Sequence, residues 1–347
     1  MIKNLLPYLS LNLTLLLTLT LPLTWSCQRE PSVVQPDLTP YPLTLPHGFP
    51  EPDFPEDNAL TQARVQLGKK LFYDPILSRD STVSCNSCHV QELAFAHDVA
   101  ISPGIEGRLG FRNAPTLVNL AYAKAVNKDG GVVKLDIQAV VPMEDEEEMD
   151  FQGILAARRM QQIPEYVDLC QKAYGDEPST YIISRALASF IRTMVSGNAL
   201  YDQYLEGKAA LSESALRGKE LFFSDRLQCS SCHSGFNFTD NSFQHNGLYK
   251  THEDLGRMRI THQPEDEGKF RVPTLRNVAL TAPYMHDGSL ATLHDVLEHY
   301  NSGGVEHPNK SDKIRPLHLT EREKLDIIEF LHTLTDSSFL VDPAFQL

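Results

Sequence analysis

The segment Cys85-Asn86-Ser87-Cys88-His89 decides how this chain folds, and a second copy of its pattern follows at Cys229-Ser230-Ser231-Cys232-His233. The pattern Cys-x-x-Cys-His is typical of covalent c-type haem attachment. The two thiols add to vinyl groups of the haem, and the adjacent histidine binds the iron as the proximal ligand. A lone Cys-x-x-Cys could arise by chance or bind zinc, but two copies that each end in histidine favour haem. We therefore predict two covalently bound haem c groups, with His89 and His233 on the irons.

Composition limits the classes of protein that fit. The chain has 347 residues, 41% of them hydrophobic, which is enough for two domains. Its formal charge of -14 at pH 7 argues against nucleic acid as a partner. Four of the six cysteines belong to the haem motifs. Of the other two, Cys170 is expected to fill an apolar position of a helix, and no disulfide is implied.

Residues 1–26 have the pattern of a signal peptide of the lipoprotein type, with Lys3 as the only charge before a Leu/Thr-rich run. The run ends with a small residue before Cys27, which is similar to a bacterial lipoprotein processing site. Either Cys27 becomes the lipid anchor, or cleavage occurs nearby and Cys27 has no such role. We favour lipidation, and the absence of Asp after Cys27 favours the outer membrane. In both cases the protein is exported to the periplasm.

Two domains related by duplication are expected after a proline-rich segment. Residues 27–57 contain many prolines, which predicts an extended, semi-rigid tether. The motif Gly-Lys-x-Leu-Phe precedes both haem motifs, at residues 68–72 and 218–222. This repeat predicts a mainly α fold of two cytochrome c-like domains, residues 58–200 and 201–347, each with one covalent haem.

Helix signals agree with that fold, whereas strand signals are sparse. Apolar residues at helical spacing predict a helix that begins after Asp57 or Asn58 and leads to the first haem motif. Ser179 is expected to cap a second apolar-faced helix. The capping box that starts at Thr320 predicts a third.

From about residue 58 to 335 the chain resembles the bacterial diheme cytochrome c peroxidases and their methylamine-utilisation (MauG-type) relatives. The resemblance implies that hydrogen peroxide reacts at the N-terminal haem, and that the C-terminal haem relays electrons from a small cytochrome c or cupredoxin. It also implies a calcium ion between the domains. The sequence blocks that carry it are residues 112–116, 135–139, 142–149, 273–277 and 281–288.

The resemblance places the catalytic groups of the peroxide pocket at Gln138, Pro142 and Glu148, which keep the spacing of the family. Bound peroxide must lose a proton from one oxygen and gain one on the other, and a carboxylate can transfer it. Glu148 is therefore the predicted general acid and base. It ends the acidic run 144–148, whose other members are expected to be solvated.

The distal side of the first haem is predicted to be open. Many diheme peroxidases carry a histidine in the loop after the first haem motif, but the corresponding residues 101–107 contain none. This is similar to relatives whose haem is five-coordinate as made. His97 lies nearby and is an alternative ligand.

The second haem needs a ligand opposite His233, and Tyr300 occupies the position of the tyrosine ligand in the methylamine-utilisation relatives. Leu293, Val296 and Leu297 share a helical face with Tyr300, which predicts that its side chain points inward. The alternative is a core tyrosine with Met285 as the ligand. A phenolate stabilises ferric iron, so Tyr300 would lower the potential of this haem.

Two further positions follow from the resemblance. Calcium ligands map to the side chain of Asn113 and the carbonyls of Thr281 and Pro283; the alternative is that these residues only shape turns. The family usually has a tryptophan between the haems, but Lys128 stands there, and the only tryptophan of the chain is Trp25 in the signal peptide.

Three functions remain open. The leading one is a periplasmic diheme peroxidase. An oxidase that modifies a protein or a small molecule is the second, favoured by Tyr300 and the missing distal histidine but not by Lys128. The third, a non-catalytic electron-transfer cytochrome, would leave Glu148 without a role.

Overall fold

The structure, a computed structural model, describes residues 34–346. The predicted signal peptide, Cys27 and the first part of the predicted tether lie outside the described residues. Within residues 34–346 no helix is both long and apolar enough to span a bilayer.

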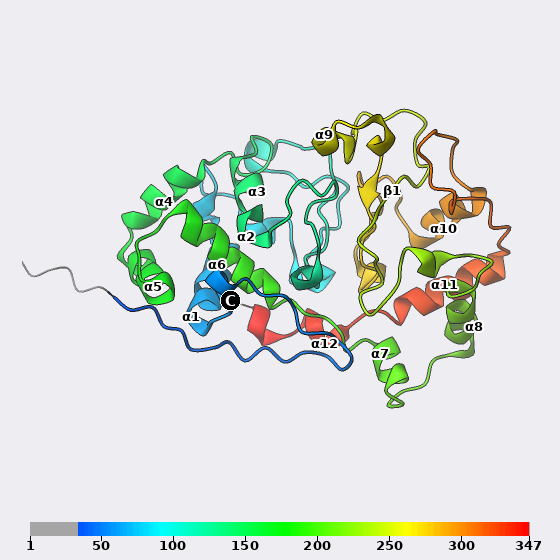
Figure 1. Cartoon of the computed structure of the whole chain (residues 1–347), viewed down its shortest axis with the longest axis horizontal. Coiled ribbons are helices and arrows are strands. Elements are labelled where there is room, and N and C mark those ends of the chain that lie inside the picture. Colours follow the sequence, from blue (N-terminus) through cyan, green and yellow to red (C-terminus); the bar gives the residue numbers. More distant parts are fainter. Residues whose placement is uncertain (1–33, 347) are drawn as a thin grey trace, which may run out of the picture. The chain divides into compact units, whose positions relative to one another are not determined.

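Two pairs of helices organise the described chain (Figure 1). In one half α1 (Gln62–Tyr73) packs on α6 (Thr180–Arg192), and in the other α8 (Glu213–Phe222) packs on α11 (Glu321–His332). Each pair lies at the centre of its own hydrophobic core. The predicted mainly α fold with two cytochrome c-like halves is therefore confirmed.

The glycine of each Gly-Lys-x-Leu-Phe motif lies where the paired helices touch. A Cβ on Gly68 would come within 1.9 Å of the Ala186 carbonyl oxygen in α6. A Cβ on Gly218 would come within 1.8 Å of the Asp326 carbonyl oxygen in α11. The repeat seen in the sequence is thus a repeated helix contact that only glycine permits.

The predicted cap of α1 at Asp57 or Asn58 is wrong. The helix begins after Thr61, whose side chain accepts a hydrogen bond from the Arg64 amide at 3.3 Å. Asn58 is buried, and its Nδ2 donates to Asp136 Oδ1 at 2.7 Å. That tertiary contact removes Asn58 from the helix start, and the chain has another capping residue three positions later.

The two other predicted helix starts are confirmed. Ser179 accepts a hydrogen bond from the Ile182 amide at the start of α6. At the start of α11, Thr320 and Glu323 form the reciprocal capping box expected from the sequence.

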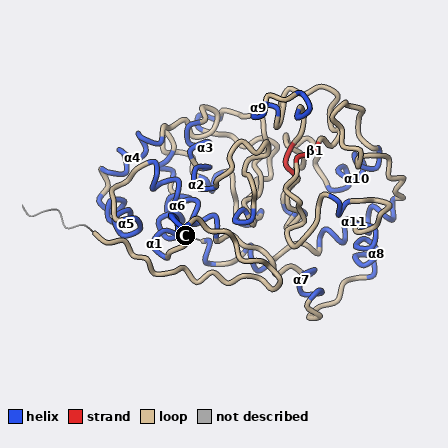
Figure 2. The backbone as a smooth tube through the Cα atoms, viewed as in Figure 1, coloured by secondary structure: helices blue, strands red, loops and turns tan. Residues whose placement is uncertain are grey.

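The remaining elements are short and joined by long loops, which cover much of the backbone in Figure 2. The only strands in the described part of the chain, β1 and β2, are two residues long and antiparallel, with Phe243 opposite Arg271. The bounds are α2 (Leu135–Gln138), α3 (Val140–Glu144), α4 (Gly153–Gln161), α5 (Pro164–Tyr174), α7 (Leu200–Leu205), α9 (Met258–Thr261), α10 (Leu293–Ser302), α12 (Ser337–Leu340), β1 (Phe243–Gln244) and β2 (Phe270–Arg271).

The described part of the proline-rich segment lies along the folded chain. Its backbone is extended apart from a turn at residues 47–48 and a short 3₁₀ turn at Glu56–Asn58. The Phe49 ring packs 6.0 Å from the Tyr122 ring and 4.6 Å from the Phe236 ring, and the Arg276 guanidinium covers it at 4.7 Å. The described part of the proline-rich segment therefore contacts both halves of the chain and does not extend into solvent.

The C-terminal segment returns to the first half, so its end lies beside α1 in Figure 1. Phe339 and Phe345 belong to the N-terminal core, where each ring lies 5.8 Å from that of Phe95. Gln91 Nε2 donates to the carbonyl of Asp342 at 3.0 Å. Residues predicted to belong to the second domain thus complete the core around the first haem motif.

Gly218→Ala is expected to destabilise the protein although alanine favours helix by about 1 kcal/mol. The added methyl meets backbone of α11, and forcing extra atoms into a packed contact costs about 1–3 kcal/mol or more. Chemical unfolding of the haem-loaded protein measures the difference. Glu220→Ala, on an exposed position of the same helix, is the matched control and should not lower stability. Equal stability of both variants would contradict the helix contact.

Candidate functional site

The two haem motifs adopt the same backbone turn. Each is a short 3₁₀ helix, Cys85–Ser87 and Cys229–Ser231. The amide of His89 donates to the Cys85 carbonyl at 3.0 Å, and the amide of His233 donates to the Cys229 carbonyl at 3.0 Å. None of the four motif cysteines is in a disulfide. Each turn therefore places two thiols and one imidazole together, as covalent haem attachment requires.

The proximal histidines are held in the tautomer that can bind iron. His89 Nδ1 lies 2.9 Å from the Phe95 carbonyl oxygen, and His233 Nδ1 lies 3.2 Å from that of Phe238. A carbonyl oxygen can only accept, so Nδ1 carries the proton and the Nε2 lone pair remains for a metal. Burial also lowers the pKa of both histidines, which favours the neutral ring.

A cavity of about 330 Å³ adjoins the second motif and extends toward the first half of the chain. Both candidate sixth ligands, Tyr300 and Met285, line it together with His233. Its walls are largely apolar, as an inserted porphyrin requires. The apolar lining includes Phe222, Leu227, Leu293, Leu297 and Leu331. The residues present fit a haem c at this motif.

Tyr300 lies in the last turn of α10, which ends at Ser302 before Gly303 in the left-handed conformation. This agrees with the helix and the break expected from the sequence. Burial raises the pKa of the Tyr300 hydroxyl. An opposing positive charge such as ferric iron would therefore be needed to hold it as a phenolate.

Gln138, at the end of α2, presents an acceptor without a protein partner. Its Nε2 donates to Asn127 Oδ1 at 2.5 Å. Its Oε1 is buried and has no hydrogen-bond partner among the described residues. Buried polar atoms are usually satisfied, so this oxygen fits a site that a ligand completes.

Backbone hydrogen bonds hold each of the other two predicted pocket residues, Pro142 and Glu148, in place. The Met149 amide donates to the Pro142 carbonyl at 3.2 Å. The Glu148 carbonyl accepts from the Ile105 amide at 2.8 Å, which ties it to the histidine-free loop 101–107. A Cβ on Gly104 would come within 2.1 Å of the Glu147 carbonyl oxygen. The loop therefore packs directly on the acidic run and fixes the backbone of Glu148.

The Glu148 carboxyl is set apart from its acidic neighbours. Burial, together with the charges of Asp145 and Glu147, raises its pKa to about 7. Glu148 is exposed to solvent, although the protein atoms around its carboxyl raise its pKa. Burial raises the pKa of both Cys85 and Cys88, and the charge of Glu148 adds to both shifts, so the carboxyl lies within electrostatic range of the first haem motif.

His97 is held by other contacts. Its Nδ1 lies 2.8 Å from the Ser102 hydroxyl. It follows Phe95, whose carbonyl contacts the side of the His89 ring opposite Nε2. Nothing in this arrangement directs His97 to the distal side of the first haem.

The candidate calcium ligands Asn113, Thr281 and Pro283 all line the cavity between the halves. The backbone amide of Asn113 donates to the His286 carbonyl at 2.9 Å. Asn113 Nδ2, in the side chain, donates to the Val99 carbonyl at 3.1 Å. Because Nδ2 is the donor, Oδ1 is the side-chain atom that remains for a cation.

Lys128 also reaches this cavity. Its Nζ donates to the Met285 carbonyl at 3.3 Å. Burial, with the charges of Arg112 and Arg271, lowers its pKa to about 7. Lys128, at the position where the family usually has a tryptophan, thus binds the loop that carries Met285.

Sequence reasoning missed two polar residues of these sites, Asn127 and Asn246. Asn127 is the partner of Gln138, and Asn246 Nδ2 lies 3.3 Å from Met285 Sδ. Both belong to loops, and their partners are distant in sequence. No local spacing signals such contacts.

Comparison with known proteins agrees with this geometry. Residues 62–210 match the family model of di-haem cytochrome c peroxidases. The methylamine utilization protein MauG of Methylorubrum extorquens is 37% identical over 84% of this chain and 82% of its own. The cytochrome c551 peroxidase of Nitrosomonas europaea is 35% identical over 78% and 79%.

The fold agrees as well. The crystal structure of a MauG-like protein associated with microbial copper homeostasis superposes with a TM-score of 0.84 and 34% identity, over 88% of this chain and 99% of that one. The matching relatives thus include proteins named as peroxidases and as MauG. With two haem motifs in equivalent turns, the chain belongs to the diheme cytochrome c peroxidase and MauG family of oxidoreductases, whose members carry two haem c groups.

Proposed function

We propose that this protein is an exported diheme peroxidase, which reduces hydrogen peroxide at the haem of His89 with electrons relayed through the haem of His233. The observation that carries the proposal is the Glu148 carboxyl, whose pKa is raised to about 7 beside Cys85 and Cys88. Relatives named as cytochrome c peroxidases support the choice of substrate.

Glu148 moves the proton in this proposal. When bound, the first haem supplies the iron and electrons that cleave the oxygen–oxygen bond. The Glu148 carboxylate takes the proton from the peroxide oxygen nearer the haem and returns it to the outer oxygen, which leaves as water. A group with a pKa near the working pH is suited to both transfers.

Gln138 and Pro142 position the reactants. Gln138 Oε1, which has no protein partner, accepts a hydrogen bond from the peroxide hydroxyl and orients it. The Pro142 carbonyl holds the Met149 amide and so fixes the backbone next to Glu148. These contacts supply orientation, which lowers the entropic cost of the reaction.

The second haem is assigned Tyr300 as the ligand opposite His233. Both reach the same cavity, and α10 presents Tyr300 to it. A phenolate favours ferric iron, so this haem would have a low potential. Met285 is the competing ligand.

The remaining assignments rest on the sequence and on the family. The electron donor is a small redox protein of the cytochrome c or cupredoxin type. Calcium binds Asn113 Oδ1 and the carbonyls of Thr281 and Pro283. The protein works in the periplasm, anchored through a lipid on Cys27, with the outer membrane favoured.

A second candidate function is a MauG-like oxidase that modifies a protein or a small molecule. The structural relative at 34% identity is MauG-like, and the Tyr300 position and the histidine-free loop are similar to those of such enzymes. Lys128 argues against it, because an amine at this position cannot pass an electron hole. Peroxide turnover with candidate small redox donors, compared with turnover-dependent modification of candidate substrates, separates the two.

The as-isolated ferric protein is expected to show one high-spin and one low-spin haem by electron paramagnetic resonance. The reason is an open distal side at the first haem and two protein ligands at the second. Two low-spin signals would defeat both enzymatic proposals and favour a non-catalytic electron-transfer cytochrome.

Glu148→Gln is expected to lower peroxide turnover by about 10²–10⁴-fold, because the amide cannot carry the proton. Stopped-flow reaction of the haem-loaded protein with peroxide measures the loss. The spin states of both haems should not change. Glu146→Gln, an exposed member of the same acidic run, is the control and should retain turnover. Equal rates in the two variants would refute the assignment.

Glu147→Gln is expected to move the acid limb of kcat/KM for peroxide to lower pH. Glu148 must be ionised to take the first proton, so wild-type activity should fall as the pH drops below about 7. The Glu147 charge raises the pKa of Glu148, and its removal lowers that pKa. A pH profile that does not change in Glu147→Gln would contradict the electrostatic coupling.

A further inference from the structure

Asn246 contacts Met285, one of the two candidate ligands of the second haem. Its Nδ2 donates to Met285 Sδ at 3.3 Å. Tyr300, the other candidate, lies on α10. All three side chains line the cavity that contains His233. One amide group therefore contacts the sulfur that competes with the Tyr300 phenol for one iron.

The orientation of the Asn246 amide is fixed by its other contacts. Oδ1 accepts from the Leu248 amide at 3.1 Å, so this end must be the oxygen. Nδ2 then points to Met285 with two hydrogens to donate. His299 Nε2 lies 3.0 Å from the Asn246 carbonyl oxygen, which ties the residue to α10 next to Tyr300.

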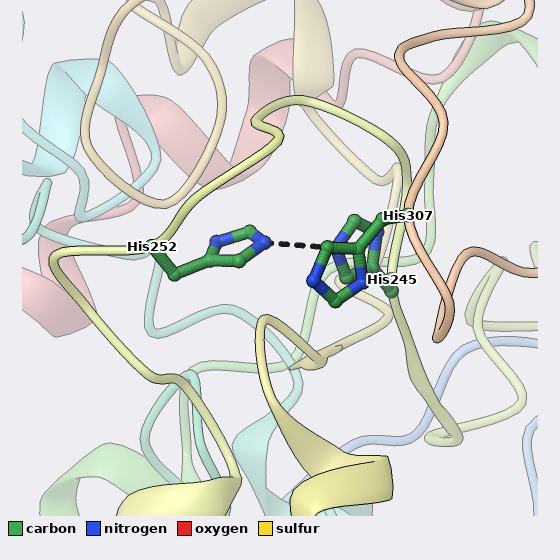
Figure 3. Close-up of side chains that lie close together, drawn as sticks. All are labelled: His245, His252 and His307. Carbon is green, nitrogen blue, oxygen red and sulfur yellow. Dashed lines mark hydrogen bonds between the residues drawn. The ribbon is translucent and has the colours of Figure 1, made fainter.

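A cluster of three histidines supports the turn that carries Asn246, and Figure 3 shows their side chains converging. The preceding residue, His245, is 1% exposed, and its Nε2 lies 2.8 Å from His252 Nε2. The His307 ring stacks on the His245 ring at 4.3 Å. A Cβ on Gly268 would come within 2.4 Å of His252 Nε2, so the backbone at Gly268 also packs tightly against the cluster.

Hydrogen bonds in this cluster favour support over metal binding. His245 Nδ1 accepts from the Gly247 amide at 3.0 Å, and His307 Nδ1 accepts from the Asn309 amide at 3.1 Å. In a neutral ring whose Nδ1 accepts, Nε2 carries the proton and has no lone pair for a metal. His245 instead donates to His252, which holds residues 245–247 in place.

Met285 is restrained at its backbone as well as at its sulfur. Its φ of 78° lies in the left-handed region, which a side chain such as methionine rarely adopts. Lys128 Nζ donates to its carbonyl at 3.3 Å. The strained backbone of Met285 is therefore held by Lys128, and its thioether is held by Asn246.

We propose that Asn246 is a positioning residue that selects Tyr300 over Met285 as the ligand of the second haem. An N–H of its side chain donates to the Met285 sulfur and holds the thioether in that contact instead of on the iron. Without this donor the Met285 sulfur is free to replace Tyr300. The inference rests on the proposed role of Tyr300 and adds how that role is enforced.

Asn246→Leu in the full, haem-loaded protein tests the selection. It removes both donors without adding charge. The expected result is a new sulfur-to-iron charge-transfer band and a rise in the potential of the second haem, both lost again in the double variant Asn246→Leu/Met285→Leu. A wild-type spectrum and potential in Asn246→Leu would overturn the proposal.

A second pair of variants distinguishes the loss of the amide donors from a folding defect. Asn246→Asp keeps the oxygen that binds Leu248 and loses the donors, so the same charge-transfer band is expected. Asn241→Asp adds the same charge to the same cavity and should retain the wild-type band pattern. Asn246→Asp with the wild-type band pattern, or the new band in both variants, would overturn the role of the amide.

Tyr300→Phe separates the identity of the iron ligand from the role of Asn246. If its low-spin signal equals that of the wild type, Tyr300 is not the ligand, and the assignment under the proposed function fails. If the signal is lost in Tyr300→Phe while Asn246→Leu behaves as wild type, Tyr300 is the ligand and only the role of Asn246 fails. A changed signal in both supports both.

Discussion

The hydrogen bond from each proximal histidine to a backbone carbonyl is the constraint on which the rest of the structure depends. Phe95 and Phe238 both have positive φ, 56° and 49°, and their carbonyls lie beside Nδ1 of His89 and His233. A strained backbone is kept only where the surroundings enforce it. In both halves the surroundings are a packed aromatic core, so the helix pairs and the metal-binding nitrogens belong to one arrangement.

The two halves are also held in a defined relation by polar contacts across their junction. Arg112 donates to Asp254 of the other half at 2.6 Å and to Asp129 of its own at 2.7 Å. Asn119 Nδ2 donates to Asn237 Oδ1 at 3.0 Å. Removing one partner of the Arg112 pair would leave an uncompensated charge, which is strongly destabilising in a partly buried site. A fixed junction suits two redox centres whose electron exchange depends on their separation.

The sequence predicted the parts of the molecule that local spacing encodes. The haem turns, the caps at Ser179 and Thr320, and the inward face of α10 follow from residues close together in the chain. The cap at Thr61 and the partners of Asn246 could not be predicted, because contacts between distant residues decide them. Glu148 could be predicted only in part. The family pattern identifies the residue, whereas its raised pKa arises mainly from surrounding protein that no local pattern reports.

The aromatic residues of the C-terminal segment have a consequence for how the protein matures. Phe339 and Phe345 fill the core against Phe95, the residue whose carbonyl orients His89. During synthesis and export the first haem motif emerges long before these rings, and domains ordinarily fold from the N-terminus onward. Here the first half cannot close its core until the second has been delivered. Haem attachment at Cys85 and Cys88 would then act on an open, incompletely packed chain, which leaves the thiols accessible to the machinery that joins them to haem.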